Sequence, residues 1–208
     1  MERENNTLDL WQYEQQAKEE GYSVICGCDE AGAGPLAGPV YAAAVVLPFG
    51  LEIPGLTDSK KLSEKKRETL FPVIKEQALA WSVACVDAAE IDATDILSAR
   101  MKAMQLAIAA LDETVDFALI DGNRDHGKSA TITTPHRCVV KGDNLSASIA
   151  AASVLAKVSR DHMMLEQAKL YPEYQFEKHK GYGTKLPYEM LRAYGPSPIH
   201  RRTFLKNL

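Results

Sequence analysis

Residues 26–40 read Cys26-Gly27-Cys28-Asp29-Glu30-Ala31-Gly32-Ala33-Gly34-Pro35-Leu36-Ala37-Gly38-Pro39-Val40. This stretch places two adjacent carboxylates immediately before a series of closely spaced glycines. The mainly apolar residues 22–26, which lead into this stretch, predict one buried strand. Residues 40–47, at its end, predict a second. We therefore interpret the connection between the two strands as an active-site turn.

The acidic pair Asp29 and Glu30 sets a condition on the geometry of this turn. Side chains alternate between the two faces of a strand, so both carboxylates can converge on one point only where the backbone leaves strand geometry. Gly32 and Gly34 would permit that bend and would let a ligand approach bare backbone N–H groups. For an isolated Asp-Glu pair, an ordinary turn with solvated acids is the alternative.

The composition is that of an ordinary globular protein. The chain has 208 residues, of which 46% are hydrophobic and 25% are charged, enough for one sizeable core. No apolar run has the length of a membrane span and the first residues are polar, so we expect a cytoplasmic protein. The net charge of −4 argues against a protein that coats polyanions, but it leaves room for a local basic groove.

The cysteines and most histidines are not expected to carry chemistry. Cys26, Cys28, Cys85 and Cys138 lack the spacing of a zinc or redox site, and we expect reduced, buried thiols. Among the histidines, only His179 lies in a segment that we expect to face a substrate.

The rest of the chain alternates helices and strands, which favours a mixed α/β domain. The predicted helices cover residues 7–20, a segment from 64 that Pro72 should kink or divide, 90–111, 146–170 and 186–194. Further strands are predicted over 81–86, 117–122 and 138–143. The last two each end in a carboxylate beside a glycine, so we expect neighbouring strands that open on one edge.

The last forty residues differ in composition from the preceding chain. Residues 178–184 form a basic, glycine-flanked loop around Tyr182, and the tail 198–204 is basic again. Basic residues around an aromatic suit phosphate pairing and stacking on a base or sugar. A solvated surface loop would have the same composition.

Four carboxylates come from three predicted strand ends: Asp29, Glu30, Asp121 and Asp143. Crowding them would raise their pKa values unless a cation neutralises the cluster. Ligation by oxygen alone suits Mg²⁺ or Mn²⁺ rather than zinc. Two such ions, roughly 3.5 to 4 Å apart, would assist an in-line displacement at phosphorus. The predicted chemistry is phosphodiester hydrolysis.

A series of motifs resembles bacterial ribonuclease HII in both identity and order. They are Asp29-Glu30-Ala31-Gly32, Leu36-Ala37-Gly38-Pro39-Val40, Asp58-Ser59-Lys60-Lys61-Leu62, Ile120-Asp121-Gly122, Val140-Lys141-Gly142-Asp143, residues 151–161, residues 179–184 and His200-Arg201-Arg202-Thr203-Phe204. The resemblance runs from about residue 22 to the C-terminus. It implies a ribonuclease H-like mixed β-sheet flanked by helices in a single domain, 1–208, with a catalytic core at about 20–170 and a C-terminal helical, substrate-binding extension at about 171–208.

The resemblance also implies an activity and its residues. The expected substrates are RNA–DNA hybrids and DNA duplexes containing ribonucleotides, cut on the 5′ side of the ribonucleotide to leave a 3′-hydroxyl and a 5′-phosphate. The implied metal-binding catalytic residues are Asp29, Glu30, Asp121 and Asp143, with two Mg²⁺ or Mn²⁺ ions. The implied substrate-binding residues are Gly32, Ala33, Gly34, Lys60, Lys141, His179, Lys180 and Tyr182. The glycines would sense the 2′-hydroxyl, and Tyr182 would pack on the sugar at the junction. We expect a monomer with no membrane contact.

Ala33 departs from the family pattern, in which this turn usually reads Gly-Arg-Gly. Alanine keeps the backbone donors but removes a charge-assisted contact worth on the order of 1.5 to 3 kcal/mol if fully made. We predict weaker substrate binding with an intact metal site. A catalytically weakened hybrid-binding protein is the alternative function.

A dinucleotide-dependent oxidoreductase is a further alternative, because Gly32-x-Gly34-x-x-Ala37 follows a predicted strand. The neighbouring residues argue against it. Asp29 and Glu30 would repel a pyrophosphate, and Gly38-Pro39 would break the helix that such a site requires.

Overall fold

Five strands form one mixed sheet in the order β3-β2-β1-β4-β5 in a computed structural model that describes residues 10–206. β1 pairs antiparallel with β2 and parallel with β4, and β4 pairs parallel with β5. The strands are β1 Ile25–Ala31, β2 Val40–Val46, β3 Ala80–Val86, β4 Phe117–Asp121 and β5 His136–Val139. The sequence predicted that the strands over 117–122 and 138–143 are neighbours. The pairing of β4 with β5 confirms this.

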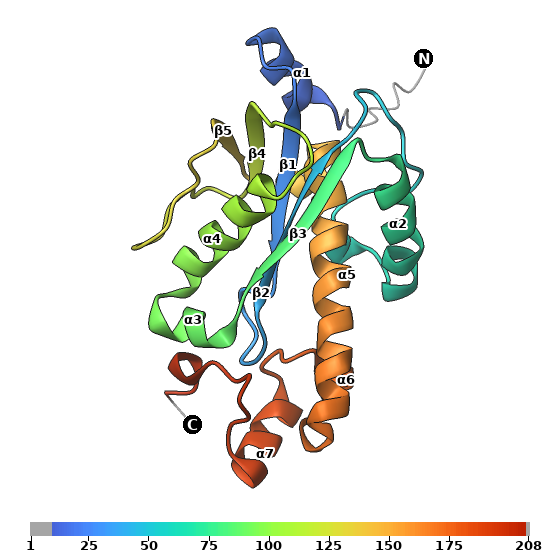
Figure 1. The fold of residues 1–208 in the computed structure, drawn as a ribbon. Helices are drawn as coiled ribbons and strands as arrows, with labels where there is room; N and C mark the ends of the chain where they lie inside the picture. Colours follow the sequence, from blue (N-terminus) through green and yellow to red (C-terminus); the bar gives the residue numbers. More distant parts are fainter. Residues whose placement is uncertain (1–9, 207–208) are drawn as a thin grey trace, which may run out of the picture.

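Helices cover both faces of the sheet, with α3 and α4 on one side and α2 and α5 on the other (Figure 1). The helices are α1 Gln12–Glu19, α2 Glu64–Gln77, α3 Ala88–Ala93, α4 Ile96–Ala109, α5 Ala147–Leu170, α6 Phe176–His179 and α7 Lys185–Tyr194. Short 3-10 turns are η1 Ser59–Lys61, η2 Gly142–Asn144, η3 Pro172–Tyr174 and η4 Arg202–Phe204. The mixed sheet flanked by helices and the C-terminal helical extension are therefore confirmed.

The helix α5 packs against the middle of the sheet because its first turns carry small side chains. Ser146 caps it by accepting a hydrogen bond from the N–H of Ile149. A Cβ added at Gly27 on β1 would lie 2.1 Å from the backbone of Ser148, so only glycine permits this approach. The contact places the N-terminus of α5 beside the strand that carries the acidic pair.

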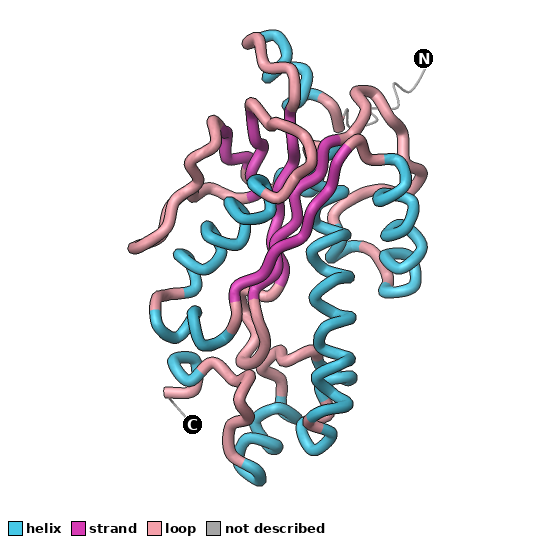
Figure 2. The backbone as a smooth tube through the Cα atoms, in the orientation of Figure 1, coloured by secondary structure: helices cyan, strands magenta, loops and turns pink. Residues whose placement is uncertain are grey.

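The C-terminal elements α6 and α7 lie beyond the far end of α5 (Figures 1 and 2). A separate apolar cluster joins them to the chain that follows β1: Ala37, Met164, Tyr174 and Phe176. The main chain reinforces this attachment, because the N–H of Gly38 donates to the carbonyl of Ile199 at 2.9 Å. No helix within residues 10–206 is long and apolar enough to cross a membrane.

The predicted bend at the acidic pair is wrong. β1 continues to Ala31, and Asp29 and Glu30 are paired with residues of β2 in a regular ladder. The turn begins only at Gly32, where φ is 94°. The two carboxylates consequently leave the strand on opposite faces.

Two further boundaries differ from the sequence prediction. The helix expected over 90–111 is divided, because Asp95 caps α4 through the N–H of Ser98 and Thr94 leaves helical geometry. The strand expected over 138–143 ends at Val139, and Asp143 lies in η2. The helix α2 continues through Pro72, so the predicted division is wrong, whereas the alternative of a kink there stays a prediction. Of the first predicted helix, residues 7–9 lie outside the described chain.

The four cysteines are free thiols, as predicted, but their expected burial is only partly correct. Cys26 and Cys28 are buried, whereas Cys138 is half-buried and Cys85 is exposed on β3.

Candidate active site

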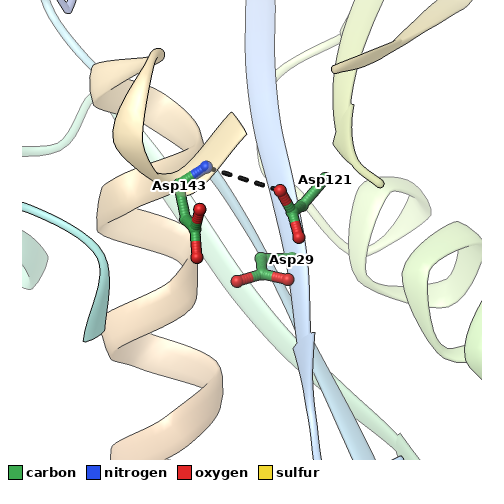
Figure 3. Close-up of side chains that lie close together, drawn as sticks. All are labelled: Asp29, Asp121 and Asp143. Carbon is green, nitrogen blue, oxygen red and sulfur yellow. Dashed lines mark hydrogen bonds between the residues drawn. The ribbon is translucent and has the colours of Figure 1, made fainter. Parts of the chain in front are cut away.

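Three aspartates converge at the edge where β1 and β4 lie side by side. Asp29 belongs to β1, Asp121 is the last residue of β4, and Asp143 lies in η2, with one carboxylate oxygen of each within 4.8 Å of the others (Figure 3). The parallel register pairs Cys28 with Ile120, so the next residue on each strand is one of these aspartates. The sheet therefore supplies two of the three side chains directly.

The third aspartate reaches the cluster through a tight turn after β5. Lys141 adopts a left-handed conformation with φ of 58°, and Gly142 donates its N–H to Asp121 Oδ1 at 2.8 Å. The N–H of Asp143 lies 3.4 Å from the same oxygen (Figure 3). A Cβ at Gly142 would lie 2.5 Å from Cδ1 of Ile149 on α5, so that side chain would have to shift to admit a larger residue.

The cluster has the chemistry of a divalent-cation site. Burial, followed by repulsion from Glu30 and Asp121, raises the pKa of Asp29 well above its ordinary value. Burial and the neighbouring carboxylates also raise the pKa values of Asp121 and Asp143. A bound cation would stabilise the ionised form of these crowded carboxylates, and their oxygen donors suit a hard ion. The residues present thus fit the metal that the sequence predicts.

Glu30 is not brought into this cluster. Its Oε1 forms an ion pair with Nη2 of Arg100 on α4 at 2.6 Å, and its Oε2 is buried without a hydrogen-bond partner among residues 10–206. Sequence reasoning did not find Arg100, because a charged residue in an amphipathic helix, like Lys102 two positions on, is ordinarily exposed to solvent. A free, buried carboxylate oxygen beside the aspartates leaves Glu30 able to accept a further ligand.

Lysines line the cleft beside the aspartates. The Nζ of Lys60 lies 3.6 Å from Asp143 Oδ2. Burial alone would lower the pKa of Lys60, but attraction to Asp29 and Asp143 outweighs it and raises the pKa. Lys60, Lys61 and Lys141 share a cleft of about 740 Å³ with Asp121 and Asp143. A phosphate group in this cleft would meet lysine ammonium groups as well as the aspartate carboxylates.

The Tyr182 loop was predicted over residues 178–184, but α6 extends to His179, so the loop begins only at residue 180. The loop lies against the glycine turn, residues 32–38. The carbonyl of Gly181 accepts from the N–H of Leu36 at 2.8 Å. Tyr182 is 39% exposed, with the guanidinium of Arg160 5.6 Å from its ring centre. The exposed face of this ring remains open to a ligand.

Two other predicted substrate contacts are occupied where this loop begins. His179 uses both ring nitrogens, since Nε2 lies 2.9 Å from the Tyr174 carbonyl and Nδ1 accepts from the N–H of Gly181. Lys180 donates through Nζ to the carbonyl of Glu177 at 2.6 Å. In this arrangement both side chains shape the loop.

A mixed sheet in this strand order, with an acidic cluster near the ends of β1 and β4 and in η2, is the arrangement of a nuclease of the ribonuclease H type. The family described as Ribonuclease HII matches residues 26–207. The chain belongs to the ribonuclease HII family and is a type 2 ribonuclease H, an endonuclease of a family that needs divalent metal ions.

Curated relatives and solved structures agree with this assignment. The chain is 53% identical over 197 residues to a ribonuclease HII of Endomicrobium trichonymphae, covering 94% of this chain and 92% of the relative. It is 48% identical over 200 residues to that of Caldicellulosiruptor saccharolyticus, with 96% of each covered. The crystal structure of ribonuclease H2 from Pyrococcus horikoshii OT3 superposes with a TM-score of 0.70 at 25% identity, over 87% of this chain and 93% of that one.

A second solved structure shares the fold. Bst-RNase HIII in complex with Mn²⁺ has a TM-score of 0.60 at 22% identity, and the match covers 92% of this chain and 69% of that one.

Proposed function

We propose that this enzyme hydrolyses the RNA strand of RNA–DNA hybrids and cuts duplex DNA on the 5′ side of embedded ribonucleotides, leaving a 3′-hydroxyl and a 5′-phosphate. The observation that carries the proposal is the convergence of Asp29, Asp121 and Asp143 beside a lysine-lined cleft. Family membership supports the substrate class.

The metal-binding residues of the proposal are the three aspartates together with Glu30, whose Oε2 is free. Two Mg²⁺ or Mn²⁺ ions bound there would activate water and stabilise the leaving oxygen. The Mn²⁺ complex of the structurally similar ribonuclease HIII supports the choice of ions. Asp29 and Asp121 hold their carboxylates on adjacent rigid strands, so the ligands need little reorganisation when an ion binds.

Substrate contacts are proposed on both sides of the metal-binding residues. Lys60 and Lys141 line the cleft and would pair with backbone phosphates. The glycine turn, which includes Gly32, Ala33 and Gly34, would bind the ribose and its phosphate through N–H groups. Tyr182 would pack on the sugar of the junction, while His179 and Lys180 keep its loop in place.

The organisation of the enzyme completes the proposal. Residues 20–170 would form the catalytic core and residues 171–208 the substrate-binding extension of one domain. The named relatives are bacterial, which supports action on DNA in the cytoplasm, and we propose that the enzyme acts as a monomer.

Cleavage of a DNA duplex containing one ribonucleotide tests the proposal. It is measured with Mg²⁺, with Mn²⁺ and with chelator, for the wild type, Asp121→Asn and the surface control Asp112→Asn. We expect a metal-dependent cut on the 5′ side of the ribonucleotide, lost in Asp121→Asn and retained in Asp112→Asn. A long RNA–DNA hybrid serves as the second substrate. Binding of both substrates without any cutting would contradict the proposal and favour the hybrid-binding alternative.

A further inference from the structure

Two buried arginines hold the backbone of the glycine turn from the inside. Arg201 has no exposed surface, and each of its guanidinium nitrogens donates to a carbonyl of this turn. The distances are 2.9 Å from Nε to Gly38, 2.9 Å from Nη1 to Ala33 and 2.6 Å from Nη2 to Gly32. One rigid, planar group therefore fixes both ends of the turn.

Arg160 on α5 connects the same turn to the Tyr182 loop. Its Nη2 donates to the Ala37 carbonyl at 3.0 Å, and its Nη1 donates to the Lys180 carbonyl at 3.0 Å. The guanidinium also lies beneath the ring of Tyr182 and has no exposed surface. A single buried side chain thus sets the spacing between the turn and the aromatic ring.

The carbonyl contacts determine where the N–H groups of the turn point. In a trans peptide the N–H of the next residue is directed opposite to the carbonyl. Because the carbonyls of Gly32 and Ala33 face Arg201, the N–H groups of Ala33 and Gly34 face away from it. Neither N–H donates a hydrogen bond to any residue between 10 and 206, and Gly34 is exposed. The turn therefore presents two free donors to solvent.

Neither arginine belongs to an ion pair with a carboxylate in the described part of the chain. Burial lowers the pKa of Arg201 to about 9, with further repulsion from Arg160, so Arg201 remains charged at neutral pH. The positive charge lies directly behind the free N–H groups, which strengthens their attraction for an anion or a hydroxyl oxygen.

We propose that Arg201 and Arg160 are positioning residues for substrate recognition. Arg201 orients the Ala33 and Gly34 donors toward the ribose and phosphate of the ribonucleotide, and Arg160 holds Tyr182 at a fixed distance from them. Neither side chain touches the substrate. This inference rests on the proposed function, because it assigns to these residues the geometry of the ribonucleotide subsite.

The test compares Arg201→Lys and Arg160→Lys with Arg137→Lys, a control on the surface of β5. Lysine keeps the positive charge, but its ammonium group lacks the planar set of donors with which arginine hydrogen-bonds several carbonyls at once. We expect the KM for a duplex with one ribonucleotide to rise roughly tenfold in both variants, with Mn²⁺ affinity by calorimetry unchanged. A purely structural role would lower thermal stability and the amount of active enzyme and leave KM unchanged, which would overturn the inference.

A double-mutant cycle tests the link between Arg160 and Tyr182. If Arg160 acts through the tyrosine, Arg160→Lys should raise KM much less in a Tyr182→Ala background than in the wild type. Full additivity would contradict this link.

Ala33→Pro tests the free donors with both arginines intact, should a lysine variant fail to fold. Proline removes the N–H of residue 33, so the inference requires a higher KM with unchanged Mn²⁺ binding. An unchanged KM would overturn it. A wild-type enzyme that cuts neither ribonucleotide substrate would instead refute the proposed function itself, which separates the two failures.

Discussion

Glu30 on β1 and Arg100 on α4 form an ion pair of 2.6 Å on the face of the sheet that α4 covers. The pair is largely buried, with side-chain exposures of 12% and 26%. Within the described part of the chain, neither the second carboxylate oxygen of Glu30 nor Nε of Arg100 has a hydrogen-bond partner. Arg100 therefore neutralises one member of the acidic pair, and a metal ion that uses Glu30 must compete with it.

Replacing Arg100 by alanine should tighten metal binding. Removing a competing positive charge near the site should tighten binding by about 1 kcal/mol or more, at least severalfold in affinity, because unit charges about 4 Å apart interact by about 1 kcal/mol in water and by about 4 kcal/mol at the effective dielectric constant near a protein surface. Calorimetric titration of the substrate-free protein with Mn²⁺ measures the change. Lys102→Ala on the same helix is the control, because Lys102 pairs with Glu90 at the surface. Equal affinities in Arg100→Ala and the wild type would show that the ion pair does not compete with the metal.

Metal addition should stabilise the fold through the three aspartates. An ion present at 100 times its Kd contributes about 2.7 kcal/mol, which corresponds to a rise in Tm of roughly 5 to 10 °C for a chain of this length. The rise should be much smaller in Asp121→Asn, which keeps an acceptor for the N–H of Gly142. Thermal unfolding with Mn²⁺ and with chelator provides the measurement.

In chelator at neutral pH, Asp121→Asn should be more stable than the wild type. Burial, followed by repulsion from Glu30, raises the pKa of Asp121 in the folded state, so its charged form destabilises the metal-free fold. This destabilisation is present above the raised pKa and disappears as the pH falls through it. A metal-free Asp121→Asn that unfolds at a lower temperature than the wild type would contradict the assignment.

His200 should make the fold sensitive to acid. Burial, followed by repulsion from Arg202, lowers its pKa to about 4, and its side chain accepts from the N–H of Ser197. Because the unfolded chain takes up the proton first, stability is complete above about pH 6.5 and declines as the pH falls toward 4, by about 3 kcal/mol in total. His200→Asn should flatten the decline of Tm between pH 7 and 5, whereas the exposed control His162→Asn should not. Parallel profiles for His200→Asn and the wild type would exclude this role.

Ala33→Arg should strengthen substrate binding. Ala33 is half-exposed and its carbonyl is already held by Arg201, so a longer side chain can extend into solvent toward a phosphate. A charge-assisted contact contributes on the order of 1.5 to 3 kcal/mol when fully made, so KM should fall roughly tenfold with kcat little changed. Ala33→Gln lengthens the side chain without adding a charge, so it separates the effect of charge on KM from the effect of length. If Ala33→Arg cleaves with wild-type kinetics, the family's usual arginine is dispensable in this chain.

Local chemistry accounts for the parts of the fold that sequence patterns predicted well. Ser63 and Ser146 each accept a hydrogen bond from an N–H three residues further on, which is the contact expected of a helix cap. Strand β2 was predicted to within one residue because its apolar run is bounded by glycine and proline. These signals lie within a few residues of the element that they define.

The wrong boundaries arose where one local signal competed with another. Asp95 is a good cap, but the apolar periodicity on both sides of it favoured one continuous helix. At Asp29 and Glu30 the glycines that follow suggested a bend, whereas pairing with β2 keeps both residues in the strand. Strand pairing involves residues distant in the chain, so it cannot be derived from the motif alone.

The sequence by itself determined the family, the alternation of strands and helices, and the identity of the acidic residues, because each depends on residue types at fixed spacing. Only the tertiary structure decided which acids meet. Docking of α4 and α5 on opposite faces of the sheet places Asp29 among the aspartates and Glu30 beside Arg100. It also buries Arg160 and Arg201 against the carbonyls of the glycine turn. Such contacts join segments far apart in the chain, and their geometry exists only once those segments have packed together.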